Sequence, residues 1–201
     1  GFLHLFGVSF PLTADRYRNF MCAVLPIYPL EYKMSEVKMR GRVVHTVGNL
    51  PAIGSTVPDF RLTKQDLSEL KLADLAGKKV IYNIFPSIDT GTCAMSVRKF
   101  NEQAAALDNT FVVCVSADLP FAAKRFCGAE GIEKVITASD LRDKDFGKRW
   151  GLTFTDGALE GLLSRAVVVT DAGGKVVYTE QVAEVIHEPD YEKALAAAKG
   201  A

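Results

Sequence analysis

The chain is poor in the two residue types that build most zinc sites and disulfide frameworks. Its 201 residues include four cysteines and three histidines. These are Cys22, Cys93, Cys114, Cys127, His4, His45 and His187. No two cysteines are spaced as Cys-x-x-Cys, and the histidines are scattered. We therefore expect no metal site, no bound cofactor and no disulfide-rich secreted scaffold; a reducing compartment with one or two reactive thiols fits better.

An excess of charge of either sign is also missing. Lysine plus arginine and aspartate plus glutamate both number 24, so the formal net charge is zero. A balanced chain gives no electrostatic reason to expect binding to nucleic acid or to a membrane surface. No apolar run approaches the roughly 20 residues of a membrane-spanning helix. We expect a cytoplasmic protein, with the periplasm as the alternative.

The first 33 residues lack the periodicity of the rest. They mix large apolar residues with Pro11, Pro26 and Pro29 and show no helical or strand pattern over a useful length. We interpret residues 1–33 as a poorly ordered extension, a tag or an upstream-extended reading frame, with Met34 as the natural start. A secretory signal is the alternative, but it needs a basic start and an unbroken apolar core. Residues 34–201 are sufficient for one domain with a full core.

From residue 34 onward, short apolar strands alternate with helical patterns. Extended segments are predicted at 37–39, 43–47, 59–63, 67–72, 79–85, 110–116, 135–137, 165–170 and 175–180, and helices at 91–107, 120–128, 144–150 and 190–199. This alternation is typical of an α/β protein. The last two strands are adjacent across a Gly-Gly turn, which implies a mixed sheet. We predict a thioredoxin-like fold, in which helices flank a mixed central sheet and the first two segments form an N-terminal β-hairpin.

The most informative segment places a lone cysteine at the start of a helix. The apolar run Lys79–Phe85 predicts a buried strand, a loop of Pro, Ser, Asp and Gly residues follows, and Cys93 lies in the first helical turn. Backbone N–H groups without helical partners, together with the helix dipole, favour a thiolate there. A thioredoxin carries Cys-x-x-Cys at this place, but here the first position is Thr90. A single activated thiolate beside a hydroxyl is suited to attack an external electrophile.

The spacing Pro86-x-x-x-Thr90-x-x-Cys93 resembles the active-site signature of the peroxiredoxins. A peroxide needs a thiolate in line with its O–O bond and hydrogen-bond donors for the departing oxygen. The Thr90 hydroxyl and the first-turn N–H groups can donate these bonds, and Pro86 can shield the sulfur from bulk water. For Thr90 alone a simple helix cap is the plainer interpretation; the combined spacing is what indicates chemistry.

Residues farther along the chain extend the candidate site. Arg165 precedes an apolar strand, so its head lies at the mouth of the sheet, where it can stabilise a thiolate and bind peroxide; a surface arginine at a strand edge is the alternative. Cys127 lies at a helix end beside glycines, a place able to open locally. Cys114 lies within a buried strand, so Cys127 is the preferred second thiol. Asp118 is predicted to cap the helix that begins at Pro120.

Longer stretches resemble the bacterial thiol peroxidases, the atypical two-cysteine peroxiredoxins. The resemblance spans residues 34–201 and is carried by the stretches 83–93, 114–121, 125–131 and 165–169. It implies that Cys93 is the peroxidatic cysteine, that Cys127 is the resolving cysteine, and that Pro86, Thr90 and Arg165 complete the site. It also implies a homodimer and a preference for alkyl hydroperoxides. Cys22 has no counterpart in the family and is given no role.

The function implied by this resemblance is that of a thioredoxin-dependent peroxidase in antioxidant defence, without metal, haem or flavin. Hydrogen peroxide or an alkyl hydroperoxide would oxidise Cys93 to a sulfenic acid, which condenses with Cys127 to a disulfide. Thioredoxin or a similar dithiol then restores both thiols by exchange. One alternative is a peroxide sensor that passes its oxidation to a partner protein. Another is a thioredoxin-fold binding or chaperone module with unreactive thiols.

Overall fold

The computed structural model of the chain describes residues 2–5, 8–11 and 34–201. The chain divides into two compact units between Tyr32 and Lys33. In the first unit, strands β1 (Phe2–Leu5) and β2 (Val8–Pro11) pair antiparallel, although the sequence shows no strand pattern there. Residues 1–33 are predicted to be poorly ordered, but the rest of this segment, including Cys22, lies outside the described residues.

A seven-stranded mixed sheet forms the centre of the second unit. Its strand order is β11-β10-β7-β8-β9-β5-β6. The strands are β5 (Arg61–Lys64), β6 (Glu69–Lys71), β7 (Lys79–Ile84), β8 (Thr110–Ser116), β9 (Ile136–Ser139), β10 (Ala166–Thr170) and β11 (Val176–Gln181). Strands β7, β8 and β9 are parallel, and the other neighbouring pairs are antiparallel. The predicted α/β fold with a mixed central sheet is confirmed.

Alternate residues of the central strands face two different apolar cores. On β7, Tyr82 belongs to one buried cluster and Ile81 to the other. On β8, Val113 belongs to the cluster of Tyr82 and Val112 to the cluster of Ile81. Successive side chains of a strand point to opposite faces of a sheet, and here both faces are covered. This is why the central strands are apolar at nearly every position instead of alternating with polar residues.

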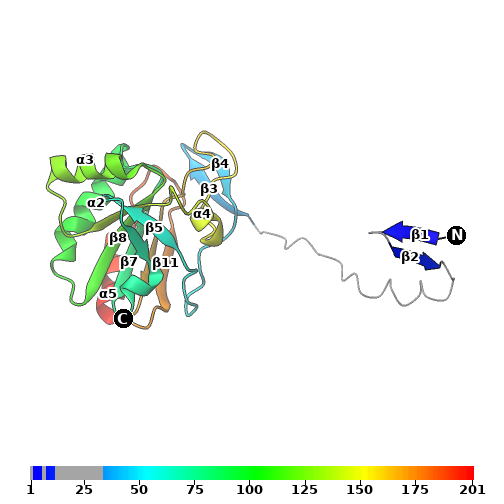
Figure 1. Ribbon diagram of the computed structural model, residues 1–201. Coiled ribbons are helices and arrows are strands. Elements are labelled where there is room, and N and C mark those ends of the chain that lie inside the picture. Colours follow the sequence, from blue (N-terminus) through cyan, green and yellow to red (C-terminus); the bar gives the residue numbers. More distant parts are fainter. Residues whose placement is uncertain (1, 6–7, 12–33) are drawn as a thin grey trace. The chain divides into compact units, whose positions relative to one another are not determined.

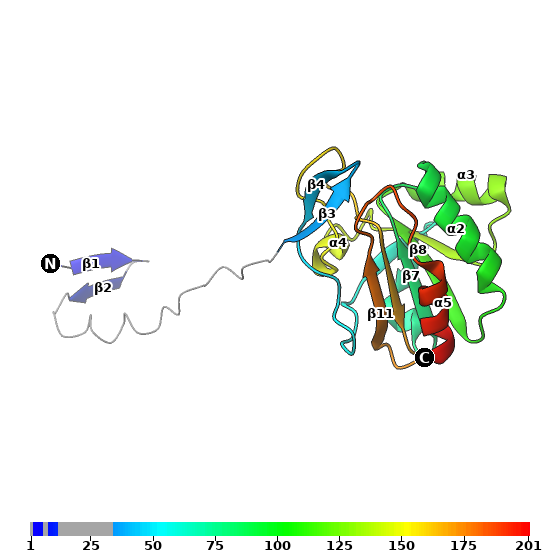
Figure 2. The same ribbon diagram turned by 180° about the vertical axis from the view of Figure 1, so that it is seen from behind.

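Helices cover both faces of the sheet (Figure 1). They are α2 (Gly91–Ala104), α3 (Pro120–Glu130), α4 (Phe146–Arg149), α5 (Tyr191–Gly200) and the 3₁₀ helix η1 (Leu72–Leu75). Helices α2, α3 and α5 pack on the core that contains Ile81. Helices α4 and η1 pack on the core that contains Tyr82. Figure 2 shows α2 and α5 lying across the same face of the sheet.

Helices α2 and α3 end two or three residues away from their predicted ends. The last turn of α2 tightens, because the N–H groups of Ala106 and Leu107 bond to carbonyl groups three residues back, so Leu107 lies beyond the α-helix. Helix α3 continues past Gly128, since the left-handed residue that ends it is Gly131 (φ 64°). Cys127 therefore lies in the last turn of α3, and its carbonyl accepts from the Gly131 N–H that ends the helix.

The predicted N-terminal hairpin is present and holds a segment that reaches the candidate site. Strands β3 (Ser35–Met39) and β4 (Arg42–Thr46) pair antiparallel. The Lys38 N–H donates to the Ala183 carbonyl at 2.7 Å, and the Lys38 carbonyl accepts from Val185 N–H at 2.8 Å. The Glu184 carboxylate accepts two bonds from backbone N–H groups of the hairpin turn, at 2.8 and 2.9 Å. The hairpin thus fixes the connection between β11 and α5.

Candidate active site

Cys93 is the third residue of α2 and is fully buried. The loop after β7 brings the chain to Thr90, whose extended backbone (φ −109°, ψ 144°) makes it the N-terminal cap of α2. Cys93 is 0% exposed and belongs to the apolar core beneath α2. Its thiol is free, as are those of Cys114 and Cys127. The predicted position of a lone thiol in the first helical turn is confirmed.

A buried guanidinium lies beside the Cys93 sulfur. Arg165 directly precedes β10 and is 2% exposed. Its Nη2 lies 3.4 Å from Cys93 Sγ, and its Nε donates to the Val185 carbonyl at 2.8 Å. Its Nη1 has no hydrogen-bond partner among the described residues. The alternative of a surface arginine is therefore wrong.

Two polar residues that the sequence did not indicate, Glu188 and Tyr191, lie near Arg165, and Lys99 is paired with the first of them. Lys99 Nζ is 3.0 Å from the Glu188 carboxylate. The Lys99 ammonium lowers the pKa of Glu188, and Tyr191 and Arg165 contribute in the same direction. Burial raises the pKa of Tyr191, and the Glu188 carboxylate raises it further. The Arg165 guanidinium therefore lies near one carboxylate, which is also paired with the Lys99 ammonium. Glu188 and Tyr191 come from the segment that the hairpin helps to fix and from the α5 helix that follows it.

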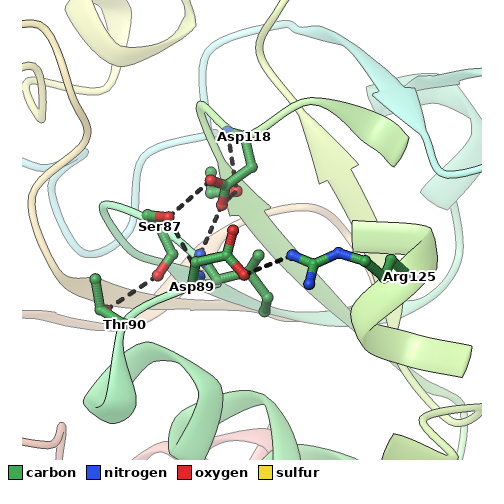
Figure 3. Close-up of polar contacts among 7 residues, drawn as sticks. Ser87, Asp89, Thr90, Asp118 and Arg125 are labelled. Carbon is green, nitrogen blue, oxygen red and sulfur yellow. Dashed lines mark hydrogen bonds and ion pairs between the residues drawn. The ribbon is translucent and has the colours of Figure 1, made fainter. Parts of the chain in front are cut away.

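Thr90 and Pro86 occupy the loop without a bond to the sulfur. The Thr90 hydroxyl donates to the Ser87 carbonyl at 3.0 Å, and Thr90 is exposed (Figure 3). Thr90 is the N-cap of α2, as the interpretation as a helix cap has it, but its side chain makes no bond to the first turn. Pro86 is buried. Of the predicted site residues, Arg165 is the one that the structure brings into direct contact with Cys93, and the roles of Thr90 and Pro86 stay predictions.

The other two described thiols differ in their access to solvent. Cys127 is 5% exposed, its sulfur lies 3.9 Å from the Thr137 hydroxyl, and it borders an open surface pocket of about 400 Å³. Burial raises the pKa of the Cys127 thiol. Cys114 is 1% exposed in the centre of the sheet and accepts a bond from Asn83 Nδ2 at 3.5 Å. Burial raises its pKa to about 12. Cys127 is thus the thiol closer to solvent.

Asp118 holds the Cys93 loop instead of capping α3. The cap of α3 is Leu119, which makes no side-chain bond. The Asp118 carboxylate accepts from Ile88 N–H at 2.6 Å and from the hydroxyls of Ser87 and Ser116 at 2.8 Å each (Figure 3). The capping prediction is wrong because these tertiary donors take the carboxylate. Strands β7 and β8 are parallel neighbours, so the loops that follow them meet at the same edge of the sheet. This topology could have predicted that Asp118, which follows β8, bonds to the Cys93 loop, which follows β7.

A partly buried carboxyl near Asp118 makes stability depend on pH. Burial raises the pKa of Asp140 from 3.8 to about 6; Lys144 opposes the rise, and Asp143 and Asp118 add to it. Because the folded state holds this proton more tightly, the stabilising contribution is complete below about pH 4 and is lost as the pH rises through about 6.

We expect Asp140→Asn to stabilise the protein near pH 8 by about 1–3 kcal/mol, since the amide stays neutral there. Near pH 4 the same substitution should change the free energy of unfolding little, because Asp140 is then already protonated. Urea unfolding at the two pH values measures the difference. An effect of equal size at both would contradict the prediction.

Within the part of the chain that the structure describes, no helix is long and apolar enough to cross a membrane. The same residues hold no group of three or more His, Cys, Asp or Glu side chains placed to bind a metal ion.

Comparison with known sequences places the chain among thiol-dependent redox proteins. The Redoxin family model matches residues 52–195. The thiol peroxidases of Mycobacterium tuberculosis and Mycobacterium bovis are each 55% identical to the chain over 164 residues, which is 82% of this chain and 98% of each relative.

Solved structures agree with this match. A peroxiredoxin-like protein from Aquifex aeolicus has a TM-score of 0.78 and 36% identity, over 83% of this chain and 98% of its own. The thiol peroxidase from Chromobacterium violaceum has a TM-score of 0.74 over 79% of this chain and 91% of its own; at 22% identity it supports the fold alone. These matches confirm the thioredoxin-like fold and the predicted peroxidase activity. The chain therefore belongs to the Redoxin family, as a peroxiredoxin of the thiol peroxidase type and hence an oxidoreductase.

Proposed function

We propose that this thiol peroxidase reduces hydrogen peroxide and alkyl hydroperoxides through Cys93, with Cys127 as the resolving thiol. The observation that carries the proposal is the 3.4 Å contact between Arg165 Nη2 and Cys93 Sγ. A fixed positive charge at this distance stabilises a negative sulfur, and the unpaired Nη1 is a donor for the departing peroxide oxygen. In this proposal Pro86 shields the sulfur, and the Thr90 hydroxyl turns from the Ser87 carbonyl to the bound peroxide.

The proposed cycle has three steps. The Cys93 thiolate attacks one peroxide oxygen, the O–O bond breaks, and the other oxygen leaves and takes up a proton as water or an alcohol. The sulfur is oxidised by two electrons to a sulfenic acid. The Cys127 thiolate then attacks that sulfur, an S–S bond forms and water leaves. A dithiol, thioredoxin in this proposal, reduces the disulfide by exchange and is itself oxidised.

We also propose the domain boundaries, the assembly and the compartment of the protein. Residues 34–201 form the peroxiredoxin domain, and residues 1–33 are an extension outside it. The protein acts as a homodimer in antioxidant defence, in the cytoplasm or alternatively in the periplasm. The match to thiol peroxidases over nearly their whole length supports a family-typical partner and assembly. Sedimentation of the full chain tests the assembly.

One equivalent of hydrogen peroxide added to the reduced full chain tests the cycle. We expect the intact mass to fall by two hydrogen atoms, with peptide mapping that joins Cys93 to Cys127. The Cys127→Ser variant should stop at a sulfenic acid that dimedone traps, and excess peroxide should oxidise it further to a sulfinic acid. The matched control is Cys114→Ala, which should form the same disulfide as the wild type.

Other results of this experiment would redirect the assignment. An unmodified Cys93 after peroxide addition would overturn the proposed function. A monomeric disulfide that still forms in Cys127→Ser would move the resolving role to Cys114 or Cys22. A stable mixed disulfide with one partner protein, without repeated turnover on thioredoxin, would favour the peroxide sensor.

A further inference from the structure

The loop before Cys93 is bonded to the segment that leads into α3 (Figure 3). Asp118 lies two residues before the start of α3, and its carboxylate accepts from Ile88 N–H at 2.6 Å and from the Ser87 hydroxyl at 2.8 Å. Asp118 is partly buried. Hydrogen bonds to a charged group in a protected place are stronger than those between neutral groups. Asp118 therefore fixes the position of residues 87–88 relative to β8.

Arg125 attaches the same loop to α3 itself. Its Nη2 lies 2.9 Å from Asp89 Oδ1, and the two side chains are 70% and 58% exposed. An ion pair this exposed is weak and is screened by salt. Arg125 precedes Cys127 by two residues on α3, and Asp89 directly precedes Thr90, the cap of the helix that carries Cys93. The pair thus joins the two cysteine-bearing helices at their reactive ends.

Helix α3 buries few of its own side chains. Its buried residues are Pro120 and Cys127, whereas Phe121 is 62% exposed. An element with so few buried apolar contacts opens at low free-energy cost. Besides the Arg125–Asp89 pair, α3 is held by Arg98 of α2, which donates two bonds of 2.9 Å to the Glu130 carboxylate. The Arg125–Asp89 pair is therefore one of two ion pairs that hold α3, and it is the one that reaches the Cys93 loop.

The two sulfurs are not bonded to each other and lie against different partners. The Cys93 sulfur contacts Arg165, and the Cys127 sulfur faces Thr137. Both thiols are free and buried, and a disulfide needs its sulfurs about 2 Å apart. The reaction of Cys93 with peroxide needs the loop held still, because a displaced thiolate loses its alignment with the O–O bond. In the inference drawn below, the step that follows releases the helix.

We propose that Asp118 is a positioning residue for the Cys93 loop, and that the Arg125–Asp89 ion pair holds α3 to that loop until the disulfide forms. This inference rests on the proposed roles of Cys93 and Cys127. The ion pair sets how long the sulfenic acid persists before resolution. It thereby sets how often excess peroxide converts the sulfenic acid to a sulfinic acid.

Quenched-flow mixing of the reduced full chain with hydrogen peroxide, followed by intact mass, separates the two steps. Asp118→Asn should slow Cys93 oxidation by about ten- to a hundredfold, because the loop loses its anchor. Arg125→Gln should speed disulfide formation by about two- to fivefold and reduce the yield of sulfinic acid. Added salt should speed disulfide formation more in the wild type than in Arg125→Gln, which keeps only the Arg98–Glu130 pair of the two. A merely structural role for Arg125 would not produce this difference in salt dependence.

Matched variants keep the outcome specific. Arg61→Gln removes another exposed guanidinium, 3.5 Å from Glu69 on the far edge of the sheet, and should react as the wild type does. Exchanging the charges, with Asp89→Arg and Arg125→Asp together, should restore the slower, salt-dependent step. If Asp118→Asn does not fold, Ser87→Ala removes one donor to the same carboxylate and should slow Cys93 oxidation in the same direction.

The result that overturns this inference differs from the one that overturns the proposed function. If the wild type forms the Cys93–Cys127 disulfide and the Asp118 and Arg125 variants match it in both steps, the positioning and holding roles are wrong. If the wild type forms no such disulfide, the proposed cycle itself fails.

Discussion

Replacing Cys93 with serine is expected to lower peroxide turnover by at least about a thousandfold, in an assay with thioredoxin, thioredoxin reductase and NADPH. The proposed nucleophile is a thiolate, whereas a serine hydroxyl stays protonated near neutral pH and cannot form a sulfenic acid. The loss should be chemical and not structural. Serine has nearly the same shape, and the Arg165 Nη2 that contacts the Cys93 sulfur can donate to its hydroxyl.

Two comparisons keep this result specific. Cys93→Ala should show the same loss, although it removes the hydroxyl and leaves a small gap in the apolar core beneath α2. Cys114→Ala should keep turnover close to the wild type. Thermal unfolding of each variant shows whether the fold is intact. Turnover of folded Cys93→Ser near the wild-type rate would contradict the assignment of Cys93.

The strand, loop and helix around Cys93 could be predicted because every local signal agrees there. The apolar run at 79–85 becomes β7, which ends one residue earlier, at Ile84. The polar loop ends at Thr90, and α2 begins at Gly91 as expected. A strand that is buried on both faces is apolar throughout, and a helix start after a Pro/Ser/Asp/Gly loop has few competing interpretations.

Asp118 shows where local rules fail. An aspartate shortly before a proline at a helix start is a good cap by sequence. In the structure, the Asp118 carboxylate accepts bonds from Ile88 and Ser87, which lie 30 and 31 residues earlier in the chain. Leu119 occupies the cap position instead. Propensity describes one segment at a time, whereas this bond depends on which loops meet at the edge of the sheet.

The surroundings of Arg165 were beyond sequence reasoning for a similar reason. Its position before an apolar strand indicates the mouth of the sheet, but its anchor is the Val185 carbonyl in an irregular segment. That segment is held by the pairing of Lys38 with Ala183 and Val185. A contact that depends on a hairpin more than a hundred residues earlier in the chain leaves no local pattern.

Arg165→Gln is expected to slow the reaction of Cys93 with peroxide by about a hundred- to a thousandfold. The substitution removes the positive charge 3.4 Å from the sulfur and the Nη1 donor that has no partner among the described residues. Arg165→Lys keeps the charge but not the planar fork. The lysine ammonium cannot donate to the Val185 carbonyl, the Cys93 sulfur and a peroxide in the geometry that the guanidinium allows. We expect an intermediate loss of about tenfold for this variant.

Alkylation of Cys93 by iodoacetamide separates a chemical role of Arg165 from a structural one, because this reaction also needs the thiolate but involves no peroxide. Arg165→Gln should slow both alkylation and oxidation. If Arg165 only supported the fold, its loss would loosen the site, and a more exposed Cys93 would be alkylated faster. Arg61→Gln, an exposed arginine at the far edge of the sheet, should leave both rates unchanged. Wild-type rates in a folded Arg165→Gln protein would mean that Cys93 reacts without the buried guanidinium. The contact on which the proposed function rests would then carry no chemistry.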